Sequence, residues 1–336
     1  MESGILVTVQ ENTDVSAARR AVIKAAEEAG FGESLAGAAA IVATEAASNL
    51  LKHAGGGEFL VHRTKCDDGY GLEILALDSG PGLIDQELCF TDGYSTVDES
   101  AGTGLGAIKR LSRFCDIYST AAGTVLISQF GAEPGKKLGI HLGFISIPYP
   151  GEDVCGDTCT VQETHGRVRI ILADGLGHGI SAFQASQAAV GDIADPEPMS
   201  PEQALQAAHQ RSKFTRGSAA SVADLDFAEG TVDYAGLGNV AGAIVSAPAL
   251  RRQMISLNGT LGYEVHSIQQ HRYPLAPDAL VILHSDGLST NWALDKYPGL
   301  FQRHPSVIAA VLIRDFRRTR DDATVVVVRA RSAGST

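Results

Sequence analysis

Positive charge is scarce in this sequence. Its 336 residues include 27 Lys and Arg against 39 Asp and Glu, which gives a formal net charge of −12. Nucleic acids and anionic membrane surfaces attract basic proteins, so we expect neither of them to be the main partner. Hydrophobic residues make up 44% of the chain and charged residues 20%, a composition typical of a folded globular protein rather than a disordered one.

Cysteine and long apolar segments are also scarce. The five cysteines are scattered and never spaced CxxC, which is typical of a reducing compartment rather than of a disulfide scaffold. The N-terminus lacks the basic region and following apolar run of a secretory signal. We find no run of about 18 apolar residues, the length that spans a membrane. These absences predict a cytoplasmic protein without a membrane-spanning segment.

A short polar segment divides the chain. At about 100–200 residues per domain, the length predicts two domains. Residues 132–137 combine turn formers and two lysines between strand-like segments, and we assign them to a linker. The first domain then covers residues 1–131 and the second covers residues 138–336.

The first domain alternates strand-like segments with amphipathic helices. Strands are predicted at residues 5–9, 58–65, 71–77, 115–120 and 124–130. Helices are predicted at residues 15–29, 35–53 and 105–113. Helices on one face of a mixed sheet make a two-layer α/β sandwich, which is the predicted fold of this domain.

The second domain has more strands and fewer helices. Strands are predicted at residues 140–147, 159–163, 168–172, 219–227, 231–234, 242–245, 280–283 and 323–329. Helices are predicted at residues 180–190, 202–214 and 306–317. This pattern predicts an α+β domain in which packed sheets are flanked by helices.

Three motifs in the first domain fit a nucleotide site. Glu45 and Asn49 are four residues apart on a predicted helix, so both face one space, where oxygen ligands suit magnesium. Asp78 ends a strand, and Gly-Thr-Gly-Leu-Gly from Gly102 opens a helix whose free amides can bind an anion. Taken singly, such glycines are more often a turn, and a Glu/Asn pair is more often a solvated helix face. The spacing fits neither a dinucleotide fingerprint nor a Walker loop.

In this order the motifs resemble the Bergerat-fold (GHKL) ATPase and kinase superfamily, and within it the anti-sigma-factor serine kinases of the RsbT and RsbW type. The resemblance covers residues 1–130. It implies that Glu45 acts as general base, that Asn49 binds Mg²⁺ with ATP, and that Asp78 reads the adenine amino group. The other residues that the resemblance places at ATP are Gly80, Gly82, Gly102, Gly104, Gly106 and Thr124.

Aspartates in the second domain stand at strand ends or in tight turns. Asp174 and Asp286 follow apolar runs, while Asp157 and Asp321 precede strand-like segments. A carboxylate at the end of a buried strand is unfavourable unless a positive charge compensates it. Any one of them is better explained as a turn, but four together favour convergence on a metal. Ligation by oxygen alone selects magnesium or manganese rather than zinc.

The segments GDT, ADGLGHG, SDGL and DDATVVVV, in this order, resemble the metal-dependent protein phosphatases (PPM), in particular the bacterial SpoIIE and RsbX branch. The resemblance covers residues 138–330 and implies two Mn²⁺ or Mg²⁺ ions. By this resemblance Asp174 bridges both ions, and the Gly175 carbonyl binds one of them. Asp286 and Asp321 complete the other ion, and Asp157 holds metal-bound water.

Some positions depart from that family's pattern or stay open. Cys155 stands where the family has a glycine, and Asn239 lies in a turn that fits the family only in part. His178 is expected either to hydrogen-bond phosphate or to cap the following helix. Asp322 is expected to be a solvated neighbour of Asp321, and which of the two binds the metal is left open.

Together the resemblances imply a bifunctional regulator of bacterial partner-switching signalling. The first domain is expected to phosphorylate a serine or threonine of a STAS-domain protein with Mg-ATP, and the second to hydrolyse that phosphate. In the alternative, only the phosphatase is active, and the first domain senses ATP or binds a sigma factor. A sigma factor or a stressosome-like complex is a further implied partner, and a homodimer is left open because related kinases are often dimeric.

Overall fold

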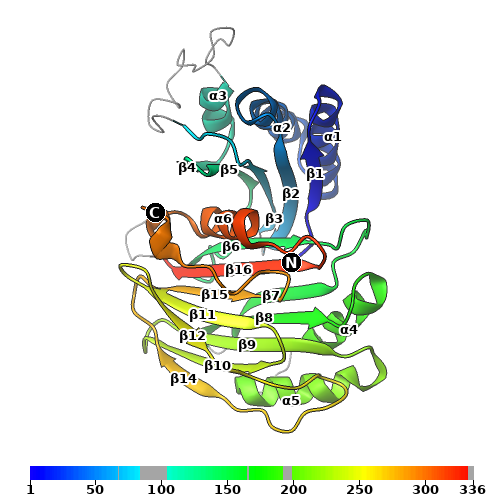
Figure 1. Ribbon diagram of the computed structural model, residues 1–336, viewed down its shortest axis with the longest axis vertical. Helices are drawn as coiled ribbons and strands as arrows, with labels where there is room; N and C mark the ends of the chain where they lie inside the picture. The colour runs from blue at the N-terminus through cyan, green and yellow to red at the C-terminus, as the bar shows by residue number, and fades with distance from the viewer. Residues whose placement is uncertain (67, 84–103, 165, 192–198, 332–336) are drawn as a thin grey trace. The chain divides into compact units, whose positions relative to one another are not determined.

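The computed structural model of the chain describes residues 1–66, 68–83, 104–164, 166–191 and 199–331. Its contacts divide the chain into two compact units (Figure 1). The N-terminal unit comprises residues 2–134, and the C-terminal unit comprises residues 135–336 together with Met1.

The N-terminal unit is a two-layer α/β sandwich. One face of its five-stranded sheet, ordered β1-β2-β3-β5-β4, packs against the helices around a shared apolar core (Figure 1). The strands are β1 (Ile5–Val9), β2 (Gly57–Cys66), β3 (Gly69–Leu77), β4 (Phe114–Thr120) and β5 (Gly123–Gly131). The helices are α1 (Asn12–Glu28), α2 (Glu33–Ala54) and α3 (Gly104–Leu111).

The sequence predicts a mixed sheet here, and that detail is wrong. All four strand pairs of the described sheet are antiparallel. Only two residues separate β2 from β3 and β4 from β5, and so short a connection joins antiparallel strands. The helical hairpin of α1 and α2 returns the chain to β2 beside β1, also antiparallel.

Helix α2 is the central helix of this unit. It begins after Gly32 and ends at Gly55, whose φ of 71° places it in the left-handed region that favours glycine. Among the described residues it is the one helix long and apolar enough to cross a membrane. Its alanines and Leu50 nevertheless pack in the core. Polar residues such as Glu45 interrupt its apolar segments, so no uninterrupted apolar run reveals it in the sequence.

The C-terminal unit is a β-sandwich flanked by helices. Its core lies between two sheets (Figure 1), with strand orders β13-β10-β9-β8-β7, where β14 also pairs with β10, and β12-β11-β15-β16-β6. The first sheet contains β7 (Asp157–Thr164), β8 (Arg167–Gly175), β9 (Ser218–Asp226), β10 (Thr231–Leu237), β13 (Ser256–Leu257) and β14 (His271–Pro274). The second contains β6 (Ile140–Ile147), β11 (Ala241–Ser246), β12 (Leu250–Met254), β15 (Leu280–His284) and β16 (Ala323–Ala330).

Helices cover the outer faces of the sandwich. On the first sheet, α4 (Ile180–Val190) and α5 (Pro201–Arg211) pack over a second apolar cluster, and on the second sheet α6 (Pro305–Phe316) lies over β6 and β16 (Figure 1). The helix predicted at residues 202–214 ends earlier, at Arg211, and continues as the 3-10 turn η2 (Ser212–Phe214). Strands β12, β13 and β14 were not predicted, because they are short, polar and at or near sheet edges.

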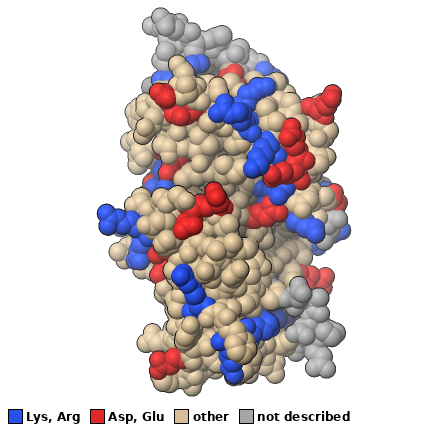
Figure 2. All heavy atoms as spheres, turned by 90° about the vertical axis from the view of Figure 1, so that its right-hand side faces the viewer, with Lys and Arg blue, Asp and Glu red and all other residues tan. Residues whose placement is uncertain are grey.

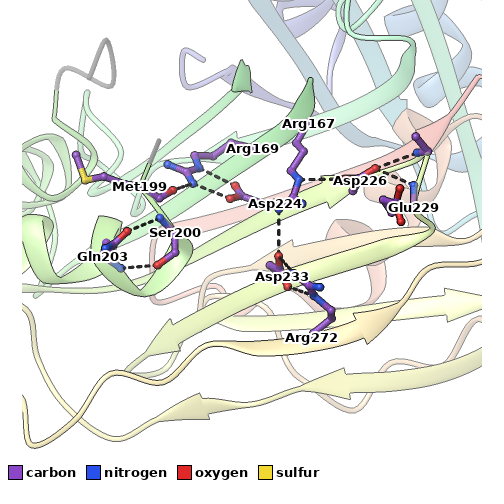
Figure 3. A network of polar contacts seen from close by, with 11 residues as sticks. Arg167, Arg169, Met199, Ser200, Gln203, Asp224, Asp226, Glu229, Asp233 and Arg272 are labelled. Atoms are coloured by element: carbon purple, nitrogen blue, oxygen red, sulfur yellow. Dashed lines mark hydrogen bonds and ion pairs between the residues drawn. The ribbon is translucent and has the colours of Figure 1, made fainter. Parts of the chain in front are cut away.

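A buried ion pair fixes the start of α5. The Arg169 guanidinium donates two hydrogen bonds of 2.6 Å to the Asp224 carboxylate on the neighbouring strand (Figure 3). Both side chains are only 6% exposed. Arg169 also donates to the Met199 carbonyl at 2.5 Å, immediately before Ser200 caps α5. The connection into α5 is therefore attached to the sheet by a charged anchor rather than by apolar contact.

A second group of ion pairs continues along the same face of the sheet. Asp233 on β10 receives two hydrogen bonds from Arg272 on β14 and one from Arg167 on β8 (Figure 3). Arg167 also reaches Asp226 at 3.1 Å. The hydrogen bonds and charge of Arg272, with the charge of Arg167, lower the pKa of Asp233. Elsewhere on the surface drawn in Figure 2, acidic and basic side chains are interspersed among uncharged ones.

Candidate functional sites

Helix α2 presents the first candidate site in the N-terminal unit. Glu45 and Asn49 are half-buried on one face of the helix, as their spacing predicts. Gly104, the first residue of α3, lies against both: a β-carbon there would be 2.8 Å from a Glu45 carboxylate oxygen and 3.9 Å from the Asn49 amide oxygen. The absence of a side chain at residue 104 thus leaves room beside the two polar groups.

Asp78 is held at the end of β3 by backbone amides. Its Oδ1 atom accepts hydrogen bonds from Gly80 N at 2.8 Å and Thr124 N at 3.0 Å. No hydrogen bond reaches its Oδ2 atom from the described residues. Gly82 has a φ of 77° and passes so close to the Thr120 carbonyl that a β-carbon would lie 2.1 Å from it. One carboxylate oxygen is thereby fixed, and the other is available to a ligand.

Ser119 is a residue of this site that the sequence reasoning missed. Its hydroxyl lies 2.9 Å from that of Thr124 and accepts a hydrogen bond from Leu83 N at 2.8 Å. Ser119 and Thr124 are directly paired across β4 and β5. A prediction of the strand register of this hairpin would therefore have identified Ser119. Gly106 lies in the first turn of α3, whereas Gly102 lies outside the described residues.

The second candidate site gathers aspartates from the ends of four strands of the C-terminal unit. Asp157 begins β7 and stands directly opposite Asp174 on β8. In the other sheet, Asp286 follows β15, and Asp321 precedes β16, the antiparallel partner of β15. Strands from both sheets therefore bring these four carboxyl groups to one end of the sandwich.

The carboxyl groups perturb one another strongly. Burial, with the neighbouring charges of Asp322 and Asp286, raises the pKa of Asp157 to about 7. Burial and the Asp286 charge raise the pKa of Asp321 to about 6. Burial and the charges of the other three acids raise the pKa of Asp174 well above its usual range. Without a positive charge nearby, burial and the mutual repulsion of the ionised carboxyl groups in this cluster raise their pKa values.

The donor set fits divalent cations that prefer oxygen. Together with burial, the neighbouring Asp286 raises the pKa of both Asp174 and Asp321, so these carboxyl groups need a shared proton or a cation to offset their repulsion. Both Asp157 oxygens are buried without a hydrogen bond of normal geometry, although the Ser285 and Thr324 hydroxyls lie near enough to lower its pKa. As they stand, no three His, Cys, Asp or Glu side chains of the described residues lie close enough together to hold a metal ion, so binding requires these side chains to move. The chemistry of the donors, all carboxylates, is that of a magnesium or manganese site.

Gly175 is enclosed by α4. A β-carbon at this position would lie 1.9 Å from the Ala182 carbonyl, so no side chain fits there without moving the helix. The Gly175 amide lies 3.3 Å from the Gly156 carbonyl, which joins this turn to the one before Asp157. The close packing keeps the backbone after Asp174 beside the cluster.

Asp322 is not the solvated neighbour that the sequence reasoning expects. It is only 3% exposed, and its Oδ1 atom accepts a hydrogen bond from Tyr149 N at 2.8 Å. Gly156 packs against its other oxygen. The two adjacent aspartates point in different directions, with Asp321 toward Asp286 and Asp322 into the protein. Asp322 therefore braces the strand ends.

His178 does not cap the following helix. Its Nδ1 atom lies 2.7 Å from Glu152 Oε1, and its ring stacks on Tyr149 at 4.2 Å between centroids. The capping position of α4 is Gly179, where no side chain serves as a cap. Neither Glu152 nor Tyr149 was a candidate from the sequence, because their loop shows no pattern that places it beside residue 178.

Hydrogen bonds from neighbouring side chains hold the turn that carries Asp286. Asn239 donates a hydrogen bond to Asp286 Oδ2. The Trp292 indole N–H donates to His284 Nε2 at 3.2 Å, while His284 Nδ1 lies 2.9 Å from the Ser285 carbonyl. These contacts hold the last residues of β15 and the aspartate after them in one arrangement.

Known families match both units. The family model described as stage II sporulation protein E (SpoIIE) matches residues 164–331, which are 168 of the 336 residues. The chain belongs to the SpoIIE family. In this SpoIIE-family chain, a model for histidine kinase-like ATPase domains matches residues 8–130.

Individual relatives support the same division. The chain is 33% identical to the serine/threonine-protein kinase RsbT of Bacillus subtilis (strain 168) over 115 residues, 34% of this chain and 86% of RsbT. It is 24% identical to the phosphoserine phosphatase RsbX of the same organism over 139 residues, 41% of this chain and 70% of RsbX. A structure solved in a study of the bacterial stressosome, a modular system adapted to control secondary messenger signalling, matches with a TM-score of 0.52 and 25% identity, covering 56% of this chain and 99% of that one.

The resemblances inferred from the motifs are thereby confirmed. The SpoIIE-family chain carries an N-terminal histidine kinase-like ATPase domain similar to RsbT and a C-terminal PPM phosphatase domain similar to RsbX. ATPase domains of this kind bind ATP, and PPM phosphatases bind metal ions, which agrees with the chemistry of the two sites.

Proposed function

We propose that this chain both adds and removes one regulatory phosphate. The N-terminal domain transfers a phosphoryl group from Mg-ATP to a serine or threonine of a STAS-domain protein, and the C-terminal domain hydrolyses it with two Mn²⁺ or Mg²⁺ ions. The observation that carries the proposal is the convergence of Asp157, Asp174, Asp286 and Asp321 from four strand ends on one acidic cluster. The same proposal includes domain limits of 1–131 and 138–336 with a linker at 132–137. It also includes a cytoplasmic location and a sigma factor or stressosome-like complex as a further partner.

In the kinase site, each polar side chain has a separate task. Glu45 accepts the proton of the attacking hydroxyl, which requires a carboxylate within hydrogen-bonding reach of it. Asn49 holds Mg²⁺ on the phosphates, and Asp78 accepts the adenine amino group on its free oxygen. Phosphoryl transfer depends mainly on positioning and charge neutralisation, which Gly104 and Gly106 support by letting phosphate approach the start of α3.

In the phosphatase site, the carboxylates hold the ions and orient the water. Asp174 and the Gly175 carbonyl would hold one ion, and Asp174 with Asp286 and Asp321 would hold the other. Asp157 accepts a hydrogen bond from the water, since its buried oxygens lack other donors of normal geometry. When bound, the two ions lower the pKa of that water and neutralise the phosphoryl oxygens. No cysteine is needed, because the water attacks phosphorus directly.

The test separates the two activities in the full chain. Asp174→Asn is expected to abolish Mn²⁺-dependent release of phosphate while leaving ATP affinity unchanged. Glu45→Ala is expected to abolish transfer from radiolabelled ATP to a STAS-domain protein while leaving phosphatase activity unchanged. Full metal-dependent phosphatase activity in Asp174→Asn refutes the metal assignment. If neither the wild type nor Glu45→Ala transfers phosphate to the STAS-domain protein, the N-terminal domain is instead an ATP-sensing or sigma-factor-binding module.

A further inference from the structure

Exposed apolar side chains gather beside the aspartate cluster. The described residues include eight large apolar side chains that are exposed. Four of them come from three segments: Leu176 in the loop after Asp174 with Ile180 at the start of α4, Phe214 at the end of η2, and Tyr263 in the loop before β14. Phe214 is 100% exposed, and the other three are between 43% and 66% exposed. We call these four side chains the apolar patch: Leu176, Ile180, Phe214 and Tyr263.

Hydrogen bonds between three loops hold the apolar patch together. Leu176 N donates to the Gly217 carbonyl at 3.0 Å, which joins the loop after Asp174 to the loop after Phe214. The Tyr263 hydroxyl donates to the Thr215 carbonyl at 3.3 Å and thereby attaches the third loop. The patch is therefore a preformed surface rather than a set of independent loop side chains.

The helix in front of Phe214 is also anchored. Arg211, at the end of α5, donates to the Ala189 carbonyl at 2.8 Å at the end of α4. The other end of α5 is attached to the sheet through Arg169 and Met199 (Figure 3). Because both ends of α5 are anchored, the exposure of Phe214 follows from the fold and not from fraying of the helix end.

An unpaired cation borders the apolar patch. The Arg216 guanidinium lies over Gly177, where a β-carbon would be 3.1 Å from its Nη1 atom. Arg216 is exposed, and among the described residues it has neither an ion pair nor a hydrogen bond through its side chain. In a chain of net charge −12, a free arginine in contact with the loop that follows Asp174 favours a phosphate, which it can bind with two parallel hydrogen bonds.

We propose that the apolar patch and Arg216 form the docking surface for a phosphoserine segment whose neighbouring residues are apolar. The proposal rests on the proposed phosphatase function and names its substrate class. Arg216 pairs with the phosphate, and Phe214 and Tyr263 cover the apolar residues beside it. A small phosphate ester would leave Phe214 in water, whereas a protein segment buries it. Leu176 and Gly177, over which Arg216 lies, follow Asp174 by two and three residues, so we expect one segment to reach both the apolar patch and the acidic cluster.

The test compares three substrates with the full chain and Mn²⁺. They are p-nitrophenyl phosphate and two nine-residue phosphoserine peptides, one with leucines and one with glycines and serines around the phosphoserine. We expect the leucine peptide to have a KM about tenfold lower than the polar peptide, in line with burial of apolar side chains. Phe214→Ser, which removes a side chain that a small ester does not reach, is expected to reduce that difference strongly without changing hydrolysis of p-nitrophenyl phosphate. The matched control is Leu250→Ser, because Leu250 is also an exposed apolar residue. It pairs with Ser246 at the end of β11 that lies away from Asp286.

Arg216 gives a different signature. Arg216→Ala is expected to raise KM for all three substrates about tenfold with little change in kcat, because all carry the same phosphate, and Arg216→Lys is expected to restore part of the loss. A change confined to the leucine peptide contradicts the assigned phosphate contact.

Further outcomes distinguish the proposals from each other. Equal KM values for both peptides, unchanged by Phe214→Ser, overturn the docking surface while leaving the phosphatase in place. Absence of hydrolysis of all three substrates overturns the proposed function, and binding of a fluorescent leucine peptide by anisotropy then decides on the surface separately. If sedimentation shows a wild-type dimer that Phe214→Ser converts to monomers, a second copy of the chain covers the patch, and the docking proposal is wrong.

Discussion

Asp157 and Asp174 stand directly opposite each other on the antiparallel strands β7 and β8. Like charges in such a cross-strand pair repel each other, and burial adds to the unfavourable energy of both carboxylates. The pair exists because the rest of the sandwich holds the two strands in this register. A cation bound between the strand ends, as proposed above, would relieve this repulsion.

Replacing Asp157 with asparagine is therefore expected to have opposite effects with and without metal. In metal-free protein at pH 8, Asp157→Asn should raise the free energy of unfolding by about 1–3 kcal/mol, because an uncompensated buried charge is lost. Mn²⁺ is expected to stabilise the wild type, and this stabilisation should be smaller or absent in Asp157→Asn. Trp292 is the single tryptophan of the chain and is 1% exposed, so its fluorescence reports unfolding of the C-terminal unit.

Asp295→Asn is the control for that experiment, since Asp295 is an exposed aspartate of the same unit. It should change neither the metal-free stability nor the effect of Mn²⁺. Equal stabilisation of wild type and Asp157→Asn by Mn²⁺ would contradict a role of Asp157 at the metal site.

Gly104→Ala should damage the kinase site without destabilising the fold. The new methyl group would lie 2.8 Å from the end of the Glu45 side chain, which can move aside but then leaves its position. We expect at least a tenfold loss of phosphoryl transfer with a small change in thermal stability. Gly37→Ala is the matched control, because residue 37 lies in α2 with open space around it, and alanine there should stabilise the helix by about 0.5–1 kcal/mol. Unchanged transfer in Gly104→Ala would show that Glu45 does not act from its position beside α3.

The sequence was most informative where a site is built within one element. Glu45 and Asn49 share a helix face because of their spacing alone, and Asp78 follows from the end of an apolar strand. The pairing of Ser119 with Thr124 depends on the register of a hairpin, which the apolar pattern of its strands leaves undetermined. The mixed sheet was a wrong prediction for the same reason, since strand direction depends on the partner.

Contacts between distant loops were beyond sequence reasoning. Asp321 and Asp322 are neighbours with the same side chain, and Asp322 is the buried one because it packs against distant residues, among them Gly156 and the Tyr149 amide, 173 residues away. Similarly, Arg216 is one arginine among many until the fold places it over Gly177. Edge strands such as β12 and β14 carry too little alternation to be recognised, because one side of each is in solvent.

The buried ion pair of Arg169 and Asp224 gives a double-mutant test. Arg169→Met alone should destabilise the C-terminal unit by about 3–5 kcal/mol, because Asp224 is left as a buried charge without a partner. Adding Asp224→Leu should restore most of the loss, since two apolar residues then replace the pair. Trp292 fluorescence in a urea titration measures both changes. Additive losses in the double variant would show that the two side chains act independently.

Acid should weaken the C-terminal unit through Asp233. The hydrogen bonds of Arg272 lower the pKa of this carboxyl group below its usual value of 3.8, so its ion pairs contribute stability above that value and lose it as the pH falls through the lowered pKa. The difference in urea midpoint between wild type and Asp233→Asn, followed by Trp292 fluorescence, should therefore be constant between about pH 5 and pH 7 and shrink below about pH 4. Asp295→Asn, at an exposed aspartate of the same unit, should match the wild type at each of these pH values. A difference for Asp233→Asn that stays constant down to pH 3 would show that the charge of Asp233 adds nothing to the stability of the sheet.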